Sequence, residues 1–196
     1  MSFAADLRRH RARHAIPDSV PSVAVPAYTA PLAPLPAARR RAFLAHLRAE
    51  LAEAFAPARR RRARKPPDPP LAPAAAAFVG TACGTCRGEC CSRGGEHAYF
   101  DADAITRQRE AEPGLTPETV LARYTAALIG ARYIGSCVFH GAAGCVLPRE
   151  MRGEVCNSFL CSDLLAGLRR VTPGAPALLV ARTGEAIRRV ALHRGS

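Results

Sequence analysis

The chain has 196 residues and a formal net charge of +12, most of it contributed by residues 1–70. This length predicts one domain with extensions, and no stretch approaches the roughly 18 apolar residues that a transmembrane helix needs. Arginine supplies nearly all of the positive charge, since Lys65 is the only lysine. That bias, together with the abundant alanine, is typical of a GC-rich genome, so the charge alone does not indicate phosphate recognition.

Residues 1–36 are rich in alanine, proline and arginine and contain few large apolar side chains. Such a segment buries too little apolar surface to offset the entropy lost on ordering, so we expect a disordered basic arm. Four arginines near the N-terminus are followed by prolines and not by the apolar core of a secretory signal: Arg8, Arg9, Arg11 and Arg13. This pattern favours a cytoplasmic protein.

Residues 37–56 have the pattern of an amphipathic helix. Its apolar side chains recur at spacings of three and four: Leu44, Leu47, Leu51 and Phe55. Such a stripe must be buried against this domain, a second copy or an unknown protein partner.

Residues 57–73 read as a basic, proline-rich linker that contains the cationic run 59–65. A solvated linker is the preferred interpretation of this run. Contact with nucleic acid or with an anionic membrane is a weaker alternative, because no aromatic side chain is interleaved for stacking on bases.

Residues 74–196 are predicted to form a compact α+β domain that is mostly helical. Asp101 is a candidate N-cap for a helix over 102–111, and Thr116 followed by Pro117 predicts a second helix start. A further helix is expected after Cys156. The runs 177–182 and 186–192 flank Thr183-Gly184-Glu185 and predict a C-terminal β-hairpin, with a terminal helix over 185–193 as the alternative.

The eight cysteines all lie in this domain, in two sequence clusters: Cys83, Cys86, Cys90 and Cys91, then Cys137, Cys145, Cys156 and Cys161. Reduced thiols in the cytoplasm favour metal binding over structural disulfides. The C-x2-C spacing of Cys83 and Cys86 lets two sulfurs reach one ion. Adjacent side chains diverge, so we expect Cys91 to point away from an ion bound by Cys90.

Thiolates suit both zinc and iron–sulfur clusters, so the ligand type leaves the metal open. Two four-cysteine zinc sites would use every thiol, whereas one iron–sulfur cluster would use four. We expect most of the cysteines to converge in space.

The order C-x2-C-x3-C-C, followed by cysteines seven, ten and four residues apart, resembles the YkgJ-like cysteine-cluster family. The resemblance extends over about residues 80–165, through these segments: Ser136-Cys137-Val138-Phe139, Gly144-Cys145-Val146-Leu147, Arg149-Glu150-Met151-Arg152 and Phe159-Leu160-Cys161. It implies a domain that chelates zinc or iron or holds an iron–sulfur cluster. Some relatives carry the cluster within protein-lysine methyltransferases that act on flagellin. Gly153 departs from the Arg-Pro that the family often has, and we expect it to loosen this turn.

Other side chains near the cysteines have possible roles at the site. Three arginines are candidates for offsetting thiolate charge and donating hydrogen bonds to sulfur: Arg87, Arg149 and Arg152. His97 and His140 are weaker candidate ligands, because eight thiols already suffice. Three carboxylates are acid/base candidates by proximity only: Glu89, Glu96 and Glu150.

We therefore predict a cytoplasmic protein that binds zinc or an iron–sulfur cluster through thiolates. One alternative is an enzyme whose redox or group-transfer chemistry, such as protein methylation, the cluster supports. Another is an interaction module with purely structural zinc. No catalytic residue is identified, because the sequence has no Ser–His–Asp order, glycine-rich phosphate loop or His-Glu-x-x-His motif.

Overall fold

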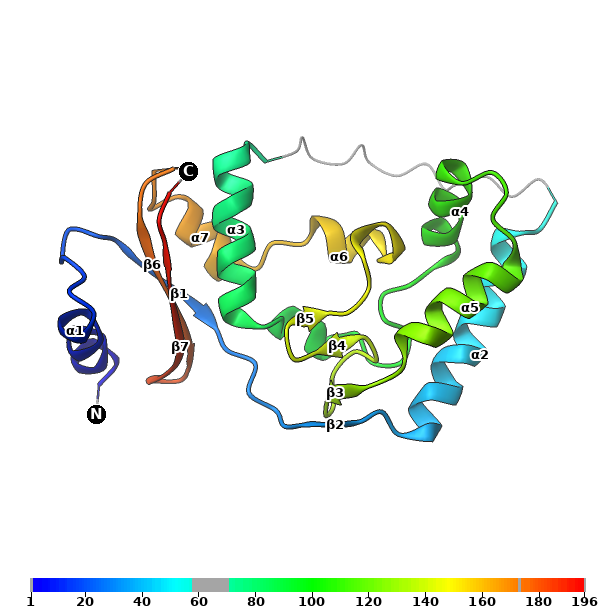
Figure 1. The fold of residues 1–196 in the computed structure, drawn as a ribbon, viewed down its shortest axis with the longest axis horizontal. Helices are drawn as coiled ribbons and strands as arrows, with labels where there is room; N and C mark the ends of the chain where they lie inside the picture. The colour runs from blue at the N-terminus through cyan, green and yellow to red at the C-terminus, as the bar shows by residue number, and fades with distance from the viewer. Residues whose placement is uncertain (1, 58–70, 173, 196) are drawn as a thin grey trace. The chain divides into compact units, whose positions relative to one another are not determined.

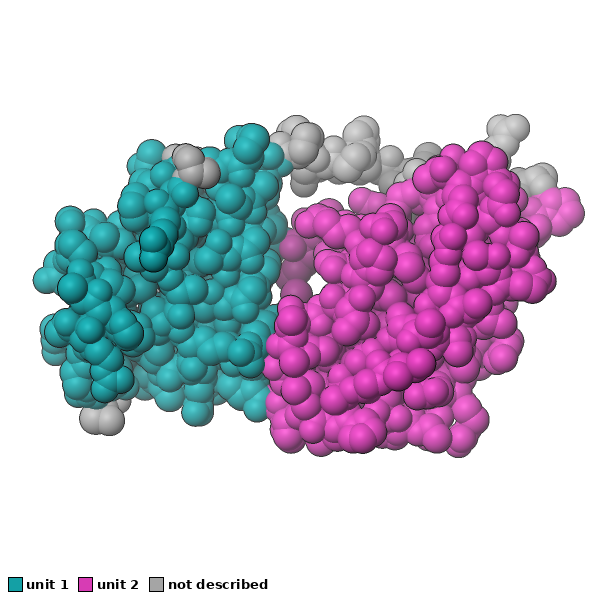
Figure 2. All heavy atoms as spheres, viewed as in Figure 1, with its two compact units in different colours: residues 1–29, 69–89, 160–196 teal, residues 30–68, 90–159 magenta. Residues whose placement is uncertain are grey.

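The computed structural model describes residues 2–57, 71–172 and 174–195. Over these residues the protein is α+β, as the sequence predicted, and it divides into two compact units (Figures 1 and 2). Unit 1 comprises residues 1–29, 69–89 and 160–196, and unit 2 comprises residues 30–68 and 90–159. The basic run 59–65 and most of the predicted linker 57–73 lie outside the described residues. No helix in the described part of the chain is both long and apolar enough to cross a membrane.

Unit 1 is built on a three-stranded sheet in the order β1-β6-β7. Its strands are β1 (Ser22–Pro26), β6 (Ala177–Thr183) and β7 (Ala186–His193). β6 and β7 form an antiparallel pair, which confirms the predicted hairpin. Three helices contact the sheet: α1 (Phe3–Arg13), α3 (Pro73–Cys86) and α7 (Ser162–Leu168). Figure 1 shows α3 and α7 beside one face of the sheet and α1 beside the other.

The N-terminal residues differ from the expected disordered arm over 1–36. Residues 3–13 form α1, and β1 pairs in parallel with β6 along its whole length. Val23 and Val25 are each only 3% exposed, because alternate side chains of β1 enter the core of unit 1. The overall composition suggested too little apolar burial, but the short alternating run at 22–26 supplies enough to complete a sheet.

Deleting residues 2–29 is therefore expected to destabilise unit 1. The deletion removes a whole strand, and each fully buried valine contributes about 1.5–3 kcal/mol to the free energy of unfolding. We expect a loss of more than about 3 kcal/mol, measured by urea denaturation followed by circular dichroism. An unchanged unfolding midpoint would show that β1 does not contribute to the fold.

Unit 2 combines helices with two small antiparallel sheets. Its helices are α2 (Ala37–Ala54), α4 (Ala102–Ala111), α5 (Pro117–Ala127) and α6 (Glu154–Ser158). Its strands pair as β2 (Leu32–Pro34) with β3 (Ala131–Tyr133), and as β4 (His140–Gly141) with β5 (Gly144–Cys145). The 3-10 helices are η1 (Glu89–Arg93), whose first residue belongs to unit 1, and η2 (Arg149–Met151).

The predicted amphipathic helix is α2, and its apolar face is buried within unit 2. Phe43, Leu47 and Leu51 enter the core, so the buried stripe begins at Phe43, whereas the sequence pattern began it at Leu44. The Phe43 ring packs edge-to-face on Phe139 at 4.8 Å. The apolar face of α2 is therefore covered by this same unit, which was one of the three occupants that the sequence left open.

Local capping explains why α4 and α5 begin where the sequence predicted. The Asp101 side chain accepts a hydrogen bond from the Ala104 amide at 3.0 Å. The Thr116 hydroxyl accepts one from the Thr119 amide at 3.2 Å. Each cap satisfies a backbone donor that the first helical turn leaves without an intrahelical partner. Cys156 lies within the short helix α6, and the further helix expected after it is α7.

Candidate metal centre

The structure groups the eight free cysteines differently from the sequence. Unit 1 holds three of them: Cys83, Cys86 and Cys161. Unit 2 holds the other five, which we call the five-thiol group: Cys90, Cys91, Cys137, Cys145 and Cys156. The first sequence cluster is thus divided between Cys86 and Cys90, and each unit combines thiols from both clusters.

In unit 1 the C-x2-C pair occupies the last turn of α3. Cys83 is exposed and Cys86 is buried. Arg87 ends the helix in a left-handed conformation with φ 61°, and its amide donates to the Cys83 carbonyl at 2.9 Å. The Glu89 amide donates to Cys86 Sγ at 3.4 Å. The chain therefore turns back after the pair and directs a backbone donor at one sulfur.

Arg189 of β7 holds this turn from within unit 1. Its guanidinium donates to the carbonyls of Thr85 and Cys86, each at 2.8 Å. A cation at the carboxyl end of a helix also complements the helix dipole. Sequence reasoning missed this residue, because a strand about one hundred positions away gives no local signal that it contacts α3.

The five-thiol group in unit 2 is assembled from four chain segments: η1, the loop before β4, β5 and α6. The Cys137 amide donates to the Cys91 carbonyl at 3.0 Å. Cys145 pairs with His140 across the β4–β5 ladder. Cys156 Sγ lies 4.0 Å from the Ala98 carbonyl oxygen. These contacts therefore bring cysteine-bearing segments that are far apart in the sequence into one region of unit 2.

The thiols of this group influence one another electrostatically. A hydrogen bond with Cys90 and then burial raise the pKa of Cys91, and the Cys137 and Cys145 thiols raise it further. Burial raises the pKa of Cys137 to about 12, with Cys145 and Cys156 adding to the effect. Burial likewise raises the pKa of Cys156 to about 11, with contributions from Cys145 and Cys90. For Cys91, Cys137 and Cys156 these shifts favour the neutral, protonated thiol when no cation is bound.

Cys91 belongs to this group, contrary to our expectation that it points away from its neighbours. Both members of the adjacent Cys90–Cys91 pair interact with other thiols of unit 2: Cys91 with Cys137 and Cys145, and Cys90 with Cys156. The short helix η1 differs from the regular helix or strand on which the expectation was based, so the two side chains can face one region.

Two glycines allow the segments of the group to approach closely. A Cβ at Gly94 would lie 2.8 Å from Cys137 Cβ and 3.2 Å from its Sγ. A Cβ at Gly153 would lie 2.1 Å from the Tyr99 carbonyl oxygen. The N-cap residue of α6 must therefore be glycine, because there is no space for a side chain at position 153. The expectation that it merely loosens the turn is corrected.

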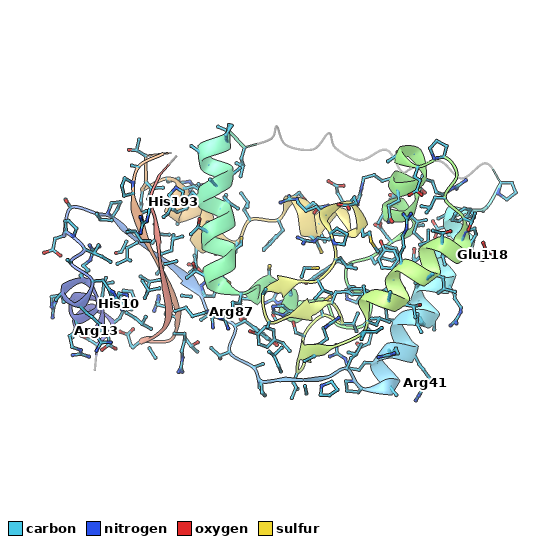
Figure 3. The ribbon with its side chains drawn as sticks, in the orientation of Figure 1. His10, Arg13, Arg41, Arg87, Glu118 and His193 are labelled. Carbon is cyan, nitrogen blue, oxygen red and sulfur yellow. The ribbon has the colours of Figure 1, made fainter. Side chains whose placement is uncertain are left out.

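The three arginines predicted to support the sulfurs have different environments. Arg152 offsets a small part of the rise in pKa that burial causes at Cys156, while its Nε donates to the Leu147 carbonyl at 2.8 Å. Arg149 instead donates to the Asn157 carbonyl at 3.1 Å. Arg87, labelled in Figure 3, is the C-cap of α3 in unit 1.

In both candidate histidine ligands, the ring Nδ1 atom makes a hydrogen bond to another group of the protein. His140 is fully buried, and its Nδ1 lies 2.7 Å from the Ser136 hydroxyl. His97 is exposed, and its Nδ1 accepts from the Tyr99 amide at 3.0 Å. Of the acidic candidates, Glu96 pairs with Arg39, Glu89 directs its amide at Cys86 Sγ, and Glu150 is exposed in η2.

Arg39 of α2 is a charged neighbour of the group that the sequence did not indicate. Its guanidinium donates to the Glu96 carboxylate and to the Ser136 carbonyl, one residue before Cys137. Its positive charge also favours the Cys137 thiolate and so offsets a small part of the rise in pKa that burial causes at that thiol. Arg39 therefore both fixes the loop that carries Cys137 and offsets negative charge beside it.

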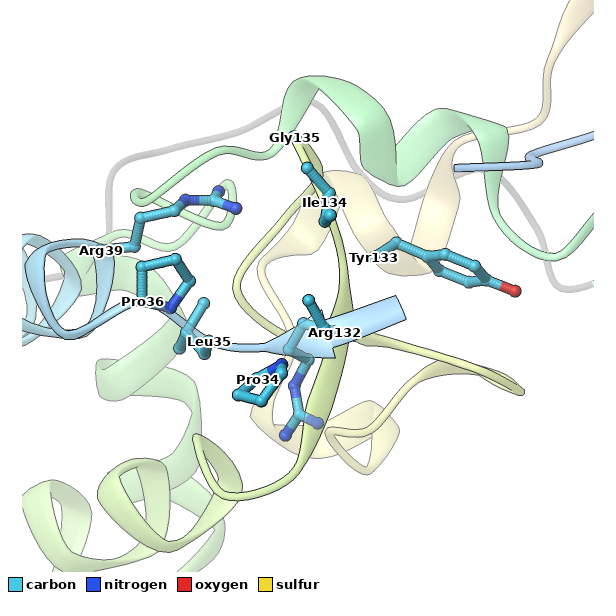
Figure 4. A pocket seen from close by; sticks show the side chains of 9 residues that line it. Pro34, Leu35, Pro36, Arg39, Arg132, Tyr133, Ile134 and Gly135 are labelled. Atoms are coloured by element: carbon cyan, nitrogen blue, oxygen red, sulfur yellow. The ribbon is translucent and has the colours of Figure 1, made fainter. Parts of the chain in front are cut away.

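A small apolar cavity of about 190 Å³ lies beside β2 and β3 (Figure 4). Pro34, Pro36 and Ile134 contribute to its wall, with Arg39 at one side. Its volume is below the roughly 300–1,000 Å³ of typical small-molecule sites, and few polar groups line it to orient a ligand. The cavity supports no ligand site.

Among the residues that the structure describes, no three His, Cys, Asp or Glu side chains are already positioned to hold a metal ion. The chemistry of the five-thiol group nevertheless fits a soft ion, because thiolates are the preferred donors for zinc and for iron–sulfur clusters. Comparisons with protein-family models, curated proteins and solved structures found no match. The resemblance to the YkgJ-like family therefore stays a prediction.

The raised thiol pKa values predict that the metal-free protein loses stability in alkali. A thiol whose folded-state pKa lies above its unfolded value stabilises the fold below the unfolded value and loses that contribution as the pH rises. For Cys137 the window runs from pH 9 to about 12. Within it the free energy of unfolding should fall by about 1.4 kcal/mol per pH unit from this thiol alone.

Urea denaturation of the metal-free chain at several pH values from 8 upward tests this dependence. Cys137→Ala is the control, since it removes one of the titrating thiols and should make the fall of stability with pH shallower by the contribution of Cys137. Equal slopes in the two proteins would refute the assignment to Cys137.

Proposed function

We propose that this chain binds zinc or an iron–sulfur cluster through thiolates of the five-thiol group in unit 2. The observation that carries the proposal is that backbone contacts draw four cysteine-bearing segments together. The Cys137 amide donates to the Cys91 carbonyl, Cys145 pairs with His140 across the β4–β5 ladder, and Cys156 Sγ lies 4.0 Å from the Ala98 carbonyl oxygen. One soft cation can bind several thiolate sulfurs at the same time. A closed zinc site or one iron–sulfur cluster needs only four sulfur ligands from the protein.

The charge balance around the group also supports a bound cation. Deprotonating several half-buried or buried thiols is costly without positive charge, and binding of a metal ion releases their protons. Arg39 and Arg152 supply part of that charge, and each also makes hydrogen bonds to backbone carbonyls. When bound, the metal would connect the four segments, as structural zinc does, or would add electron-transfer chemistry if it were an iron–sulfur cluster.

The three cysteines of unit 1 stay candidate ligands of a separate metal ion within that unit. The amide of Glu89 is directed at Cys86 Sγ, and such N–H···S hydrogen bonds stabilise a thiolate ligand. Cys161 and Cys86 border the same core of unit 1, since Cys86 is part of it and Cys161 packs against it.

Anaerobic purification of the full chain, with an absorption spectrum and metal analysis, tests the proposal. A colourless protein with stoichiometric zinc supports a zinc site, and visible charge-transfer absorption with iron and sulfide supports a cluster. A folded chain that contains neither metal, and takes up neither on anaerobic reconstitution, would overturn the proposal.

A further inference from the structure

The loop that carries Cys137 is hydrogen-bonded at every backbone polar group of residues 136–138. The loop lies between β3 and β4, outside any helix or strand. Four of these hydrogen bonds join main-chain groups: the Ser136 amide to the Tyr133 carbonyl at 3.3 Å, the Cys137 amide to the Cys91 carbonyl at 3.0 Å, the Val138 amide to the Gly95 carbonyl at 3.1 Å, and the His140 amide to the Cys137 carbonyl at 2.9 Å. The other two groups are the carbonyls of Ser136 and Val138, directly before and after Cys137. Each of them accepts a hydrogen bond from an arginine side chain.

The first of these arginines comes from α2. The Arg39 guanidinium donates to the Ser136 carbonyl and also to the Glu96 carboxylate (Figure 4). Its side chain is only 20% exposed. The carbonyl before Cys137 is therefore tied to a helix whose apolar face is buried in the core of unit 2.

The second arginine is Arg132 of β3, which the sequence did not indicate. It is 5% exposed, and its Nε donates to the Val138 carbonyl at 3.0 Å. Its two terminal nitrogens donate to three further carbonyls, which belong to the end of α5 and to the chain that follows it: Ala127, Ile129 and Ala131. A guanidinium presents its donors in a rigid planar fork, so these acceptors fix its orientation. The carbonyl after Cys137 is therefore tied to the end of α5.

The side chain of Cys137 is confined as well as its backbone. A Cβ at Gly94 would lie 2.8 Å from Cys137 Cβ, so the main chain of Gly94 packs directly on this side chain. Cys137 is 7% exposed. Its position is thus set by the packing of unit 2, with hydrogen bonds on both sides of it.

We propose that Arg39 and Arg132 are a pair of positioning residues, which we call the arginine clamp, and that the clamp holds Cys137 where it binds the metal. The inference rests on the proposed function and assigns two residues to that site. Neither guanidinium has to contact the metal, because each acts through a carbonyl next to the ligand residue. A ligand that is already held in place loses less conformational freedom on binding, which increases the affinity.

The test compares Arg39→Gln and Arg132→Gln with Arg109→Gln in the full chain. Arg109 is the matched control, since it is also an arginine of unit 2 that donates to a backbone carbonyl. Its acceptor is Ala54 and its guanidinium lies over the Phe55 ring, so it does not hold the Cys137 loop. Zinc affinity is measured by competition with a chromophoric chelator. We expect at least about tenfold weaker binding in both clamp variants, since loss of a group that orients a ligand typically costs 10–100-fold. Arg109→Gln should bind zinc as tightly as the unmodified chain.

A second measurement separates positioning of Cys137 from general stabilisation of unit 2. The metal-free proteins are treated with iodoacetamide, and the modification rates of Cys137 and Cys145 are followed by peptide mass spectrometry. Access controls the reactivity of a buried thiol, and local opening of a loop exposes only the residues in it. We expect the ratio of the Cys137 rate to the Cys145 rate to rise several-fold in the clamp variants and to stay unchanged in Arg109→Gln. If Arg132→Gln does not fold, Arg39→Gln decides, because that side chain is less buried.

The outcomes distinguish failure of the clamp from failure of the proposed function. If the unmodified chain binds zinc and a folded clamp variant binds it equally tightly, the clamp does not position a ligand and the inference is overturned. A parallel rise in the rates of Cys137 and Cys145 would also overturn it, because the arginines would then only stabilise unit 2. If the unmodified chain binds neither zinc nor iron, the proposed function fails and this inference fails with it.

Discussion

Replacing Cys137 with alanine should abolish stoichiometric metal binding. Cys137 is only 7% exposed, interacts with Cys145 and Cys156, and its amide donates to the Cys91 carbonyl. Binding of structural zinc to small peptides provides about 10–16 kcal/mol, which is also folding free energy, so loss of one ligand forfeits a large part of it. Metal analysis after anaerobic purification measures the effect, and urea denaturation measures the lost stability.

Val138→Ala is the matched control for this substitution. Val138 is fully buried in the same core, next to Cys137, and its truncation removes packing but no metal donor. We expect the control to lower the free energy of unfolding while it retains the metal. A Cys137→Ala protein that keeps its full metal complement would exclude Cys137 as a ligand.

The same comparison applies to Cys91, for which sequence and structure give opposite expectations. Divergence of adjacent side chains predicts that Cys91→Ser retains metal, whereas the grouping of Cys91 with Cys90, Cys137 and Cys145 predicts that it loses metal. We expect Cys91→Ser to be as damaging as Cys137→Ala.

Gly153→Ala is expected to destabilise unit 2 and to displace Cys156. The new Cβ would lie 2.1 Å from the Tyr99 carbonyl oxygen, which is a backbone atom. The amides on either side of Tyr99 are held, because that of Ala98 donates to the Gly94 carbonyl and that of Phe100 to the His97 carbonyl. Overpacking typically costs 1–3 kcal/mol, and a clash with fixed backbone should reach about 3 kcal/mol or more. The cost is measured by urea denaturation and the displacement by weaker metal binding.

Gly114→Ala provides the control for Gly153→Ala. Gly114 also belongs to unit 2, and a Cβ there would have no neighbour within 4 Å. Its substitution should leave stability and metal binding nearly unchanged. If both variants behaved alike, the close approach of α6 to the Tyr99 segment would be refuted.

The features that the sequence predicted well are local ones. Asp101 and Thr116 cap their helices through amides only three residues away, so the signal and its effect lie in one short segment. The C-terminal hairpin likewise joins two runs that are separated by a tight turn at Gly184. Such patterns can be read without knowing the rest of the fold.

The features that the sequence missed are long-range ones. β1 pairs with a strand about 150 residues away, and only its alternating Ser-Val-Ala-Val-Pro pattern hinted at this role. The five-thiol group depends on contacts between η1, β5 and α6, so spacing along the chain did not reveal which thiols share a region. Arg39 reaches the Cys137 loop from a helix near the start of unit 2. Only the packing of the folded unit brings Arg39 next to the loop that carries Cys137.

X-ray absorption at the edge of the bound metal tests the central claim most directly. For zinc, thiolate ligation by the five-thiol group predicts a first shell of four sulfurs at about 2.3 Å. For an iron–sulfur cluster, the same account predicts sulfur-only iron coordination with nearby iron atoms. A first shell dominated by oxygen or nitrogen at about 2.0–2.2 Å would contradict it.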